Sequence, residues 1–265
     1  MKGDSRRELR QWIWVLLCAL AIFSTVPAAR GVQKFVYASA GKDFFTYLVL
    51  SVIIAGLAVI LYFFIFRLKV KNISQYLWAL AGSGLYVYFT TRLRKHPEEA
   101  VHLLEYGLLS FFLFKALTCR IRDWTVYITT LLIVSFVGTM EEFVQWVTPG
   151  RVWDFKDVGT NILGGSIAQL IIWKGIRPDS IGGPLKKASV KIFSVILTVD
   201  LILTGLCLSN TPDAVTRYTA IFKSLSWLRA EEPMSEFGHI KTAWILIAVS
   251  LIVIWSSVVR WIKRH

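Results

Sequence analysis

Three groups of polar side chains interrupt long apolar segments in the middle of this sequence. The first group is His102, Glu105 and Tyr106. Spacings of three and four residues place these side chains on one face of a helix. An imidazole beside a carboxylate is suited to general acid–base chemistry, although such a pair is also common as a purely structural contact.

The second group consists of two adjacent carboxylates and an amide, Glu141, Glu142 and Gln145. Carboxylates within an apolar helix predict that at least one of them is protonated or has a cationic partner. Successive side chains on a helix point about 100° apart. We expect Glu142 to be the more central of the two acids and Glu141 the less central one.

The third group follows a Pro-Gly step that predicts the end of one helix and the start of another. Arg151 comes first, and Asp154, Asp157 and Asn161 then recur at spacings of three and four. Either aspartate fits the capping of a helix N-terminus, but Asn161 lies a full turn deeper. Gly164 continues the same face and predicts the close approach of another helix.

The elements that must position these groups are apolar blocks of membrane-spanning length. The chain has 265 residues, of which 55% are hydrophobic and 18% charged, with a mean hydropathy of +0.56. This composition excludes a soluble globular enzyme, a disordered chain and a disulfide scaffold, and unbroken apolar blocks exclude a β-barrel. We predict an all-α, polytopic transmembrane bundle of about eight spans. The blocks lie near 11–29, 44–66, 75–91, 101–118, 124–147, 158–174, 191–208 and 242–261.

The distribution of Lys and Arg predicts the orientation of these spans. Lys and Arg are more numerous in the loops that would lie on the same side of the membrane as both termini. This excess predicts that both termini are cytoplasmic. The net charge of +13 is then explained by these loops rather than by nucleic acid. With this orientation, all three polar groups converge on the extracytoplasmic half of the membrane. One alternative is that residues 26–28 form a signal-peptide cleavage site, which would leave seven spans.

Some polar residues lie apart from the three groups. Lys115 is expected to extend along its helix toward the cytoplasmic end, whereas Asp200 is expected to need a protein partner. The loop 209–241 fits either a helix on the outer membrane surface or an ordinary packed loop. Glu236 and His239 within it are placed near the mouth of the predicted cavity. The cysteines, Cys18, Cys119 and Cys207, match no metal motif.

The residues of the three groups resemble those of the VanZ-like family of bacterial membrane proteins. The resemblance covers residues 90–175 and, more weakly, the first apolar block. Its motifs are His102-Leu-Leu-Glu105-Tyr106, Glu142-x-x-Gln145, Pro-Gly-Arg151 and Asp157-x-x-x-Asn161-x-x-Gly164. The chain departs from the family in having Glu99 where a basic residue often stands and Ala168 where glycine is common. The remaining C-terminal third carries no family motif.

The resemblance implies a bacterial inner-membrane protein of the cell envelope, and its best-known member is linked to low-level resistance to teicoplanin. It supplies no reaction. We expect a first span and loop at 1–43, a VanZ-like core at 44–185 and a C-terminal helical pair at 186–265. The sequence gives no oligomeric state.

Function remains open between three hypotheses. In the first, a lipid-linked cell-wall precursor is bound by Tyr106, Gln145, Arg151, Asp154 and Asn161, with Arg151 meeting a phosphate. In the second, His102, Glu105, Glu142 and Asp157 are catalytic in a hydrolase or transferase acting on lipid-linked phosphates. The third is a proton-coupled transporter. No cofactor is expected, although carboxylates with one histidine would suit a divalent cation such as Mg²⁺ or Mn²⁺.

Overall fold

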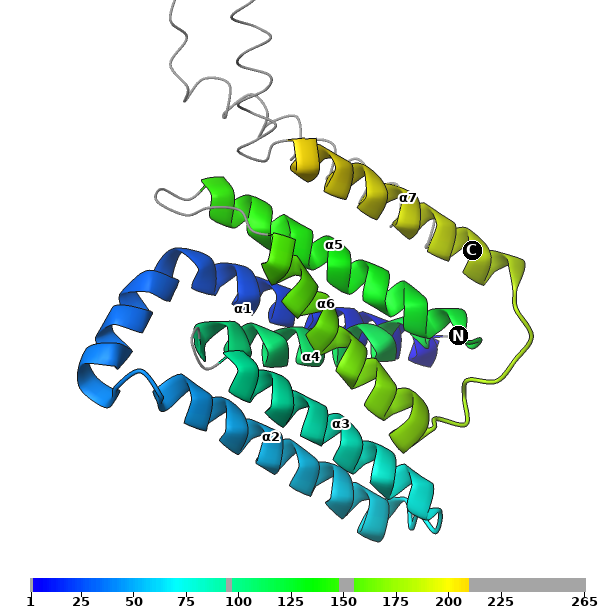
Figure 1. Ribbon diagram of the computed structural model, residues 1–265. Helices are drawn as coiled ribbons and strands as arrows, with labels where there is room; N and C mark the ends of the chain where they lie inside the picture. Colours follow the sequence, from blue (N-terminus) through cyan, green and yellow to red (C-terminus); the bar gives the residue numbers. More distant parts are fainter. Residues whose placement is uncertain (1, 94–96, 148–154, 210–265) are drawn as a thin grey trace, which may run out of the picture. The chain divides into compact units, whose positions relative to one another are not determined.

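The protein is described by a computed structural model that covers residues 2–93, 97–147 and 155–209. The described chain is helical throughout, as predicted (Figure 1). Its α-helices are α1 (Lys2–Ala40), α2 (Phe44–Tyr62), α3 (Ile73–Arg92), α4 (Pro97–Leu117), α5 (Thr125–Val147), α6 (Phe155–Leu170) and α7 (Lys187–Ser209). Two short π-helical segments, η1 (Phe63–Arg67) and η3 (Ile171–Ile176), extend α2 and α6.

The prediction of eight membrane spans is wrong. Within the described residues, five helical segments are long and apolar enough to cross a membrane, at Ser5–Thr25, Phe44–Arg67, Glu99–Leu117, Thr125–Gln145 and Lys187–Cys207. The blocks at 75–91 and 158–174 do form helices, but α3 is rich in hydroxyl and glycine residues. The 16 residues of α6 include an aspartate, an asparagine and a glutamine. The predicted span at 242–261 lies outside the described residues.

Helix α4 is the central helix of this arrangement. It packs most extensively against α6 and also contacts α1, α2, α3 and α5. Tyr106, Leu109 and Leu113 of α4 form one apolar cluster with Val15 and Ile22 of α1. In a second apolar cluster, Ala100 and Leu103 of α4 pack with residues of α2, α3 and α6. The helix that carries the first polar group therefore contacts five other helices.

Glycines allow this close packing of α4, α5 and α6. A methyl group on Gly164 of α6 would overlap the carbonyl oxygen of Leu103 in α4. A methyl group on Gly138 of α5 would lie 3.1 Å from Asn161 Nδ2 of α6. The predicted approach of another helix at Gly164 is confirmed, and that helix is α4.

A buried carboxylate joins the loop before α5 to the start of α7. Asp123 is fully buried and accepts hydrogen bonds from the backbone and hydroxyl groups of Thr125, which opens α5. It also accepts hydrogen bonds from the Lys186 backbone, at 3.4 Å, and from the Ser189 hydroxyl. This contact anchors α7 alongside α5, where Figure 1 shows it.

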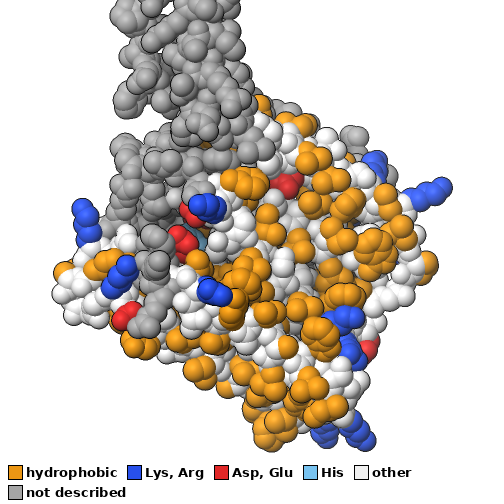
Figure 2. Space-filling model, viewed as in Figure 1, with side chains coloured by type: hydrophobic (Ala, Val, Ile, Leu, Met, Phe, Trp, Pro, Cys, Tyr) orange, Lys and Arg blue, Asp and Glu red, His pale blue; other side chains and the backbone are white. Residues whose placement is uncertain are grey.

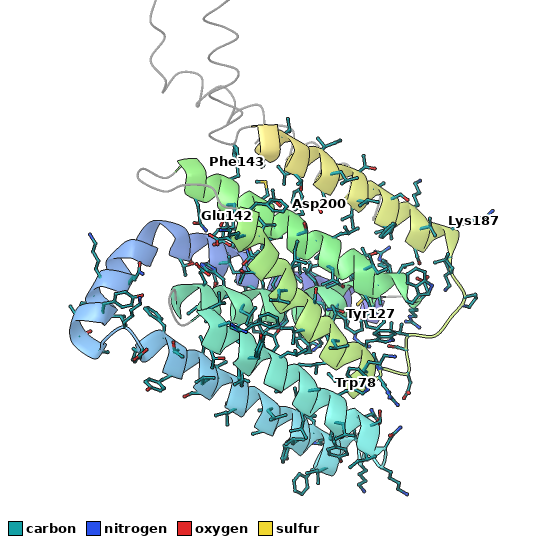
Figure 3. The ribbon with its side chains drawn as sticks, viewed as in Figure 1. Trp78, Tyr127, Glu142, Phe143, Lys187 and Asp200 are labelled. Carbon is teal, nitrogen blue, oxygen red and sulfur yellow. The ribbon has the colours of Figure 1, made fainter. Side chains whose placement is uncertain are left out.

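The two polar residues placed apart from the main groups behave differently. Asp200 of α7 is buried and faces Ser135 of α5, so it is surrounded by protein rather than by lipid, as expected (Figure 3). Lys115 is exposed, and its Nζ lies 5.3 Å from the ring centroid of Phe111. Hydrophobic side chains cover much of the visible surface, with Lys and Arg side chains both within this face and at its margin (Figure 2).

Candidate functional site

Glu141 is the centre of a buried polar cluster between α4, α5 and α6. The Tyr106 hydroxyl donates a hydrogen bond of 2.8 Å to Glu141 Oε2. Gln145 Nε2 lies 3.2 Å from Glu141 Oε1, and Asn161 Nδ2 lies 3.5 Å from Oε2. The side chains of Tyr106, Glu141, Gln145 and Asn161 are all buried. One carboxyl group thus receives donors from three helices.

Glu142 belongs to the same cluster through Gln145. Gln145 Nε2 donates to Glu142 Oε1 at 2.9 Å, so one amide group bridges both carboxyl groups of α5. Glu142 is also fully buried, and Figure 3 shows it at the end of α5 that approaches the start of α6. The amide bridge reduces the cost of placing two acids side by side in an apolar helix.

His102 and Glu105 form the accessible edge of the cluster. His102 Nδ1 lies 3.1 Å from Glu105 Oε2 and 3.7 Å from Glu141 Oε1. The side chains of His102 and Glu105 are 29% and 26% exposed, whereas that of Glu141 is 1% exposed. Solvent or a ligand can therefore reach the imidazole while the carboxyl group behind it stays inside the protein.

Asp157 lies near this edge at the start of α6. Its charge acts on the imidazole of His102, which places Asp157 on the same side of the bundle. The structure thus brings His102, Glu105, Tyr106, Glu142, Gln145, Asp157 and Asn161 to one end of α4, α5 and α6. Arg151, Asp154, Glu236 and His239 lie outside the described residues.

The expectation that Glu141 is less central than Glu142 is wrong. Its side chain points between α4 and α6, where it meets Tyr106 and Asn161. The available signal was its spacing: Gly138, Glu141 and Gln145 recur at three and four residues and share one face of α5. Because Gly138 contacts Asn161, that face is the one packed against α6.

The VanZ/LLP1 family matches residues 12–177 of this chain, which is more than half of its length. The chain belongs to this family. Neither the curated proteins nor the solved structures gave a significant match. The family match begins within α1 and includes α2 through η3, so the polar cluster and the three helices that form it lie within the VanZ/LLP1 region.

The chemistry of this VanZ/LLP1 cluster is dominated by hydrogen-bond acceptors. Glu105, Glu141, Glu142 and Asp157 supply carboxyl groups, and His102 supplies an imidazole. Such a site favours ligands that donate hydrogen bonds, such as hydroxyl, amide or ammonium groups. Among the residues that the structure describes, no three acidic, histidine or cysteine side chains are arranged to hold one metal ion. The described part of the cluster therefore gives a divalent cation no ready-made ligand set.

Proposed function

We propose that this VanZ/LLP1 protein binds the head group of a lipid-linked envelope precursor at its polar cluster and thereby affects susceptibility to glycopeptides such as teicoplanin. The observation that supports this proposal is the gradient of exposure across the cluster, from the accessible His102–Glu105 edge to the buried Glu141. A bound head group would meet the edge first and would be held by groups whose positions the protein already fixes.

The acceptor-rich composition indicates which part of such a precursor is recognised here. Lipid-linked cell-wall precursors carry sugar hydroxyl groups and peptide amide or ammonium groups beside their phosphates. Carboxyl groups attract these donors and repel phosphate. In this proposal Glu105 and His102 contact the sugar or peptide portion, and Arg151 is the partner of the phosphate.

The experiment compares lipids that copurify with the full-length protein and with variants at the cluster edge. Glu105→Gln keeps the size of the side chain and removes its charge, and Arg151→Ala removes the predicted phosphate partner. Glu8→Gln is the matched control, because Glu8 pairs with Arg120 at 2.8 Å and lies far from the cluster in sequence and in the fold.

We expect an isoprenoid phosphate-linked glycan in the wild type and in Glu8→Gln, and at least tenfold less of it in the two site variants. Teicoplanin susceptibility of cells expressing each variant should change in parallel. Equal precursor content in the wild type and Glu105→Gln would contradict the proposal.

A second candidate function is a membrane-embedded hydrolase or transferase. It is favoured by the carboxyl groups of Glu105 and Glu141, which both lie near Nδ1 of His102. Such an arrangement can orient the imidazole as a general base through its other nitrogen. In that case, purified protein should release phosphate or diphosphate from the precursor, and His102→Gln should lose turnover while it still retains the lipid. Absence of turnover from a preparation that retains the lipid would exclude this candidate.

The orientation of the site is part of the proposal. Residues 68–72, 118–124 and 177–186 connect helices at the end of the bundle opposite the cluster, and they are proposed to be cytoplasmic. A membrane-impermeant thiol reagent should label Lys71→Cys only after the cells are opened, whereas Lys42→Cys should react in intact cells. The native cysteines are replaced by alanine in both variants.

A further inference from the structure

A second site lies at the end of the bundle opposite the polar cluster. It is an open pocket of about 630 Å³ between the start of α5, the π-helical segment η3 and the loop that leads to α7. Trp124, Tyr127 and Trp173 line it together with Lys174 and Arg177. Figure 3 shows Tyr127 near the end of α6, away from Glu142. None of the polar-cluster residues belongs to this pocket.

One wall of the pocket is aromatic and open to the surroundings. The ring centroids of Tyr127 and Trp173 are 6.2 Å apart, and Tyr127 also stacks on Phe114 with centroids 5.3 Å apart. Trp124 and Trp173 are 55% and 52% exposed. Exposed tryptophans at the ends of spanning helices are typical of the membrane interface, where one edge meets hydrocarbon and the other meets head groups.

The cations stand directly beside this aromatic wall. Lys174 Nζ lies 3.8 Å from the ring centroid of Trp173. Arg177 Nε donates to the Lys174 carbonyl at 2.9 Å, and Nη2 donates to Ser74 Oγ at 3.1 Å. These two bonds fix the guanidinium group in place, and its remaining N–H donors have no partner among the described residues. A guanidinium group held in this way is preorganised to bind a phosphate.

The backbone at Arg177 is strained in a way that favours glycine. Arg177 ends η3 in the left-handed region, with φ of 48° and ψ of 66°, where a side chain is costly and glycine is the usual residue. Gln75 Nε2 of α3 holds this turn by donating to the Gly175 carbonyl at 2.8 Å. An arginine at a position that suits glycine points to a use for its side chain.

We propose that this pocket binds the phosphate of an anionic phospholipid in the membrane leaflet at this end of the bundle. The phosphate lies between Lys174 and Arg177, and an acyl chain lies along Trp173 and Tyr127. Asp179 is the single acidic residue among the lining side chains, so the lining carries a net positive charge. Basic pockets between helix ends attract anionic head groups in this way. A soluble phosphate would gain nothing from the exposed aromatic wall, which is why the lipid is the favoured ligand.

Because the backbone at Arg177 favours glycine, a glycine variant at this position is expected to fold. Arg177→Gly removes the guanidinium group and relieves the left-handed backbone, so its melting temperature should equal or exceed that of the wild type. Lys174→Gln removes the second cation and keeps the length of the side chain. Lys71→Gln is the matched control, because Lys71 is exposed in the α2–α3 loop at the same end of the bundle and does not line the pocket.

The test is native mass spectrometry of the full chain in detergent, titrated with phosphatidylglycerol and, separately, with phosphatidylethanolamine. We expect the wild type and Lys71→Gln to retain phosphatidylglycerol at least fivefold better than phosphatidylethanolamine. Arg177→Gly and Lys174→Gln should lose this preference. Inorganic phosphate at millimolar concentration should not displace the lipid.

Two results would overturn the proposal. Retention of phosphatidylglycerol by Arg177→Gly at the level of the wild type would show that the pocket does not hold the phosphate. The second result is displacement of the lipid by inorganic phosphate, together with an equal loss of phosphatidylglycerol retention in both pocket variants. That result would show that the pocket binds a soluble anion instead.

Discussion

Glu141 shows how a carboxyl group is stabilised inside an apolar bundle. Burial of a polar group without partners costs several kcal/mol. Here donors from Tyr106, Gln145 and Asn161 approach one carboxyl group, and His102 lies nearby. Each donor comes from a fixed helix face. The carboxyl group is therefore fully hydrogen-bonded only when the helices are correctly packed, and these hydrogen bonds in turn hold the helices in position.

The first prediction concerns the hydroxyl group of Tyr106. Tyr106→Phe removes the 2.8 Å hydrogen bond to Glu141 without changing the packed ring. Because a buried acceptor loses a donor, we expect a loss of about 1–3 kcal/mol in the free energy of unfolding. Thermal unfolding of the purified protein, followed by intrinsic fluorescence, measures the change.

Tyr88→Phe is the control for this substitution. The Tyr88 ring is 48% exposed, and its hydroxyl accepts a hydrogen bond from Arg92 on the surface of α3. We expect its effect to stay within about 0.5 kcal/mol. If both variants unfold at the temperature of the wild type, the Tyr106 hydroxyl does not stabilise the cluster.

Sequence reasoning identified most members of the cluster because helical spacing defines which residues share a face. It placed His102, Glu105 and Tyr106 together, and likewise Asp157 and Asn161. It ranked Glu141 below Glu142, because the face of α5 that meets α6 depends on packing between helices. Spacing within one helix carries no information about the neighbour that the face will meet.

At the scale of elements, the contact between α4 and α6 sets the geometry of the site. Gly164 lies against the backbone of Leu103, next to His102 in the chain. Tyr86 of α3 donates a hydrogen bond of 2.7 Å to the Gly164 carbonyl. This contact between three helices therefore lies one helical turn from Asn161 of the polar cluster.

The second prediction tests this close approach. In Gly164→Ala the new methyl group would overlap the Leu103 carbonyl oxygen, which is backbone and cannot move without separating α4 from α6. Overpacking of this kind costs about 1–3 kcal/mol. We expect a lower melting temperature together with weaker retention of the proposed head group.

Gly159→Ala serves as the control on the same helix. A methyl group on Gly159 would meet nothing within 4 Å, and alanine favours the helix by about 1 kcal/mol relative to glycine. This variant should be as stable as the wild type or more stable. Equal destabilisation by the two substitutions would show that contact with α4 does not explain the effect of Gly164→Ala.

Eight spans were predicted, whereas five candidate spans are found among the described residues. Counting apolar blocks treats every helix as if it faced lipid. In the VanZ/LLP1 region, α3 and α6 pack against other helices, and their buried positions include Ser83, Thr90, Asn161 and Gln169. Gln169 Nε2, for example, donates to Ser110 Oγ of α4 at 2.8 Å. Hydropathy is a weak guide to such helices because their polar groups are satisfied by protein.

At the scale of the whole molecule, Asp123 links parts of the chain that are far apart in sequence. Burial by itself would raise the pKa of Asp123, but hydrogen bonds from Ser189, Thr125 and the Lys186 backbone hold the pKa below its ordinary value. The carboxylate form is therefore the one that fastens α7 to the loop before α5.

The third prediction is a pH dependence that follows from this lowered pKa. The charged group stabilises the fold fully above its ordinary pKa of 3.8, and this contribution disappears as the pH falls through the lower value of the folded state. Asp123→Asn lacks the titrating group. The difference in melting temperature between wild type and variant should be largest near pH 7 and should shrink below pH 3.8.

Thermal unfolding at a series of pH values, with both proteins in the same detergent, measures this difference. A difference that stays constant down to pH 3 would show that Asp123 acts through the shape of its side chain and not through its charge.

The length of α1 affects which bilayer thicknesses the protein can tolerate. Its candidate span has 21 residues, or about 31 Å of helix, which matches an average hydrocarbon layer. The helix continues to Ala40 and turns before it reaches α2 (Figure 1). The interior of α1 contains Pro27, which has no backbone N–H to continue the helical hydrogen bonds. In a thinner or thicker membrane, the segment of α1 after Pro27 can shift its position along the membrane normal. The packing of α4 against α6 would then stay the same across lipids of different acyl length.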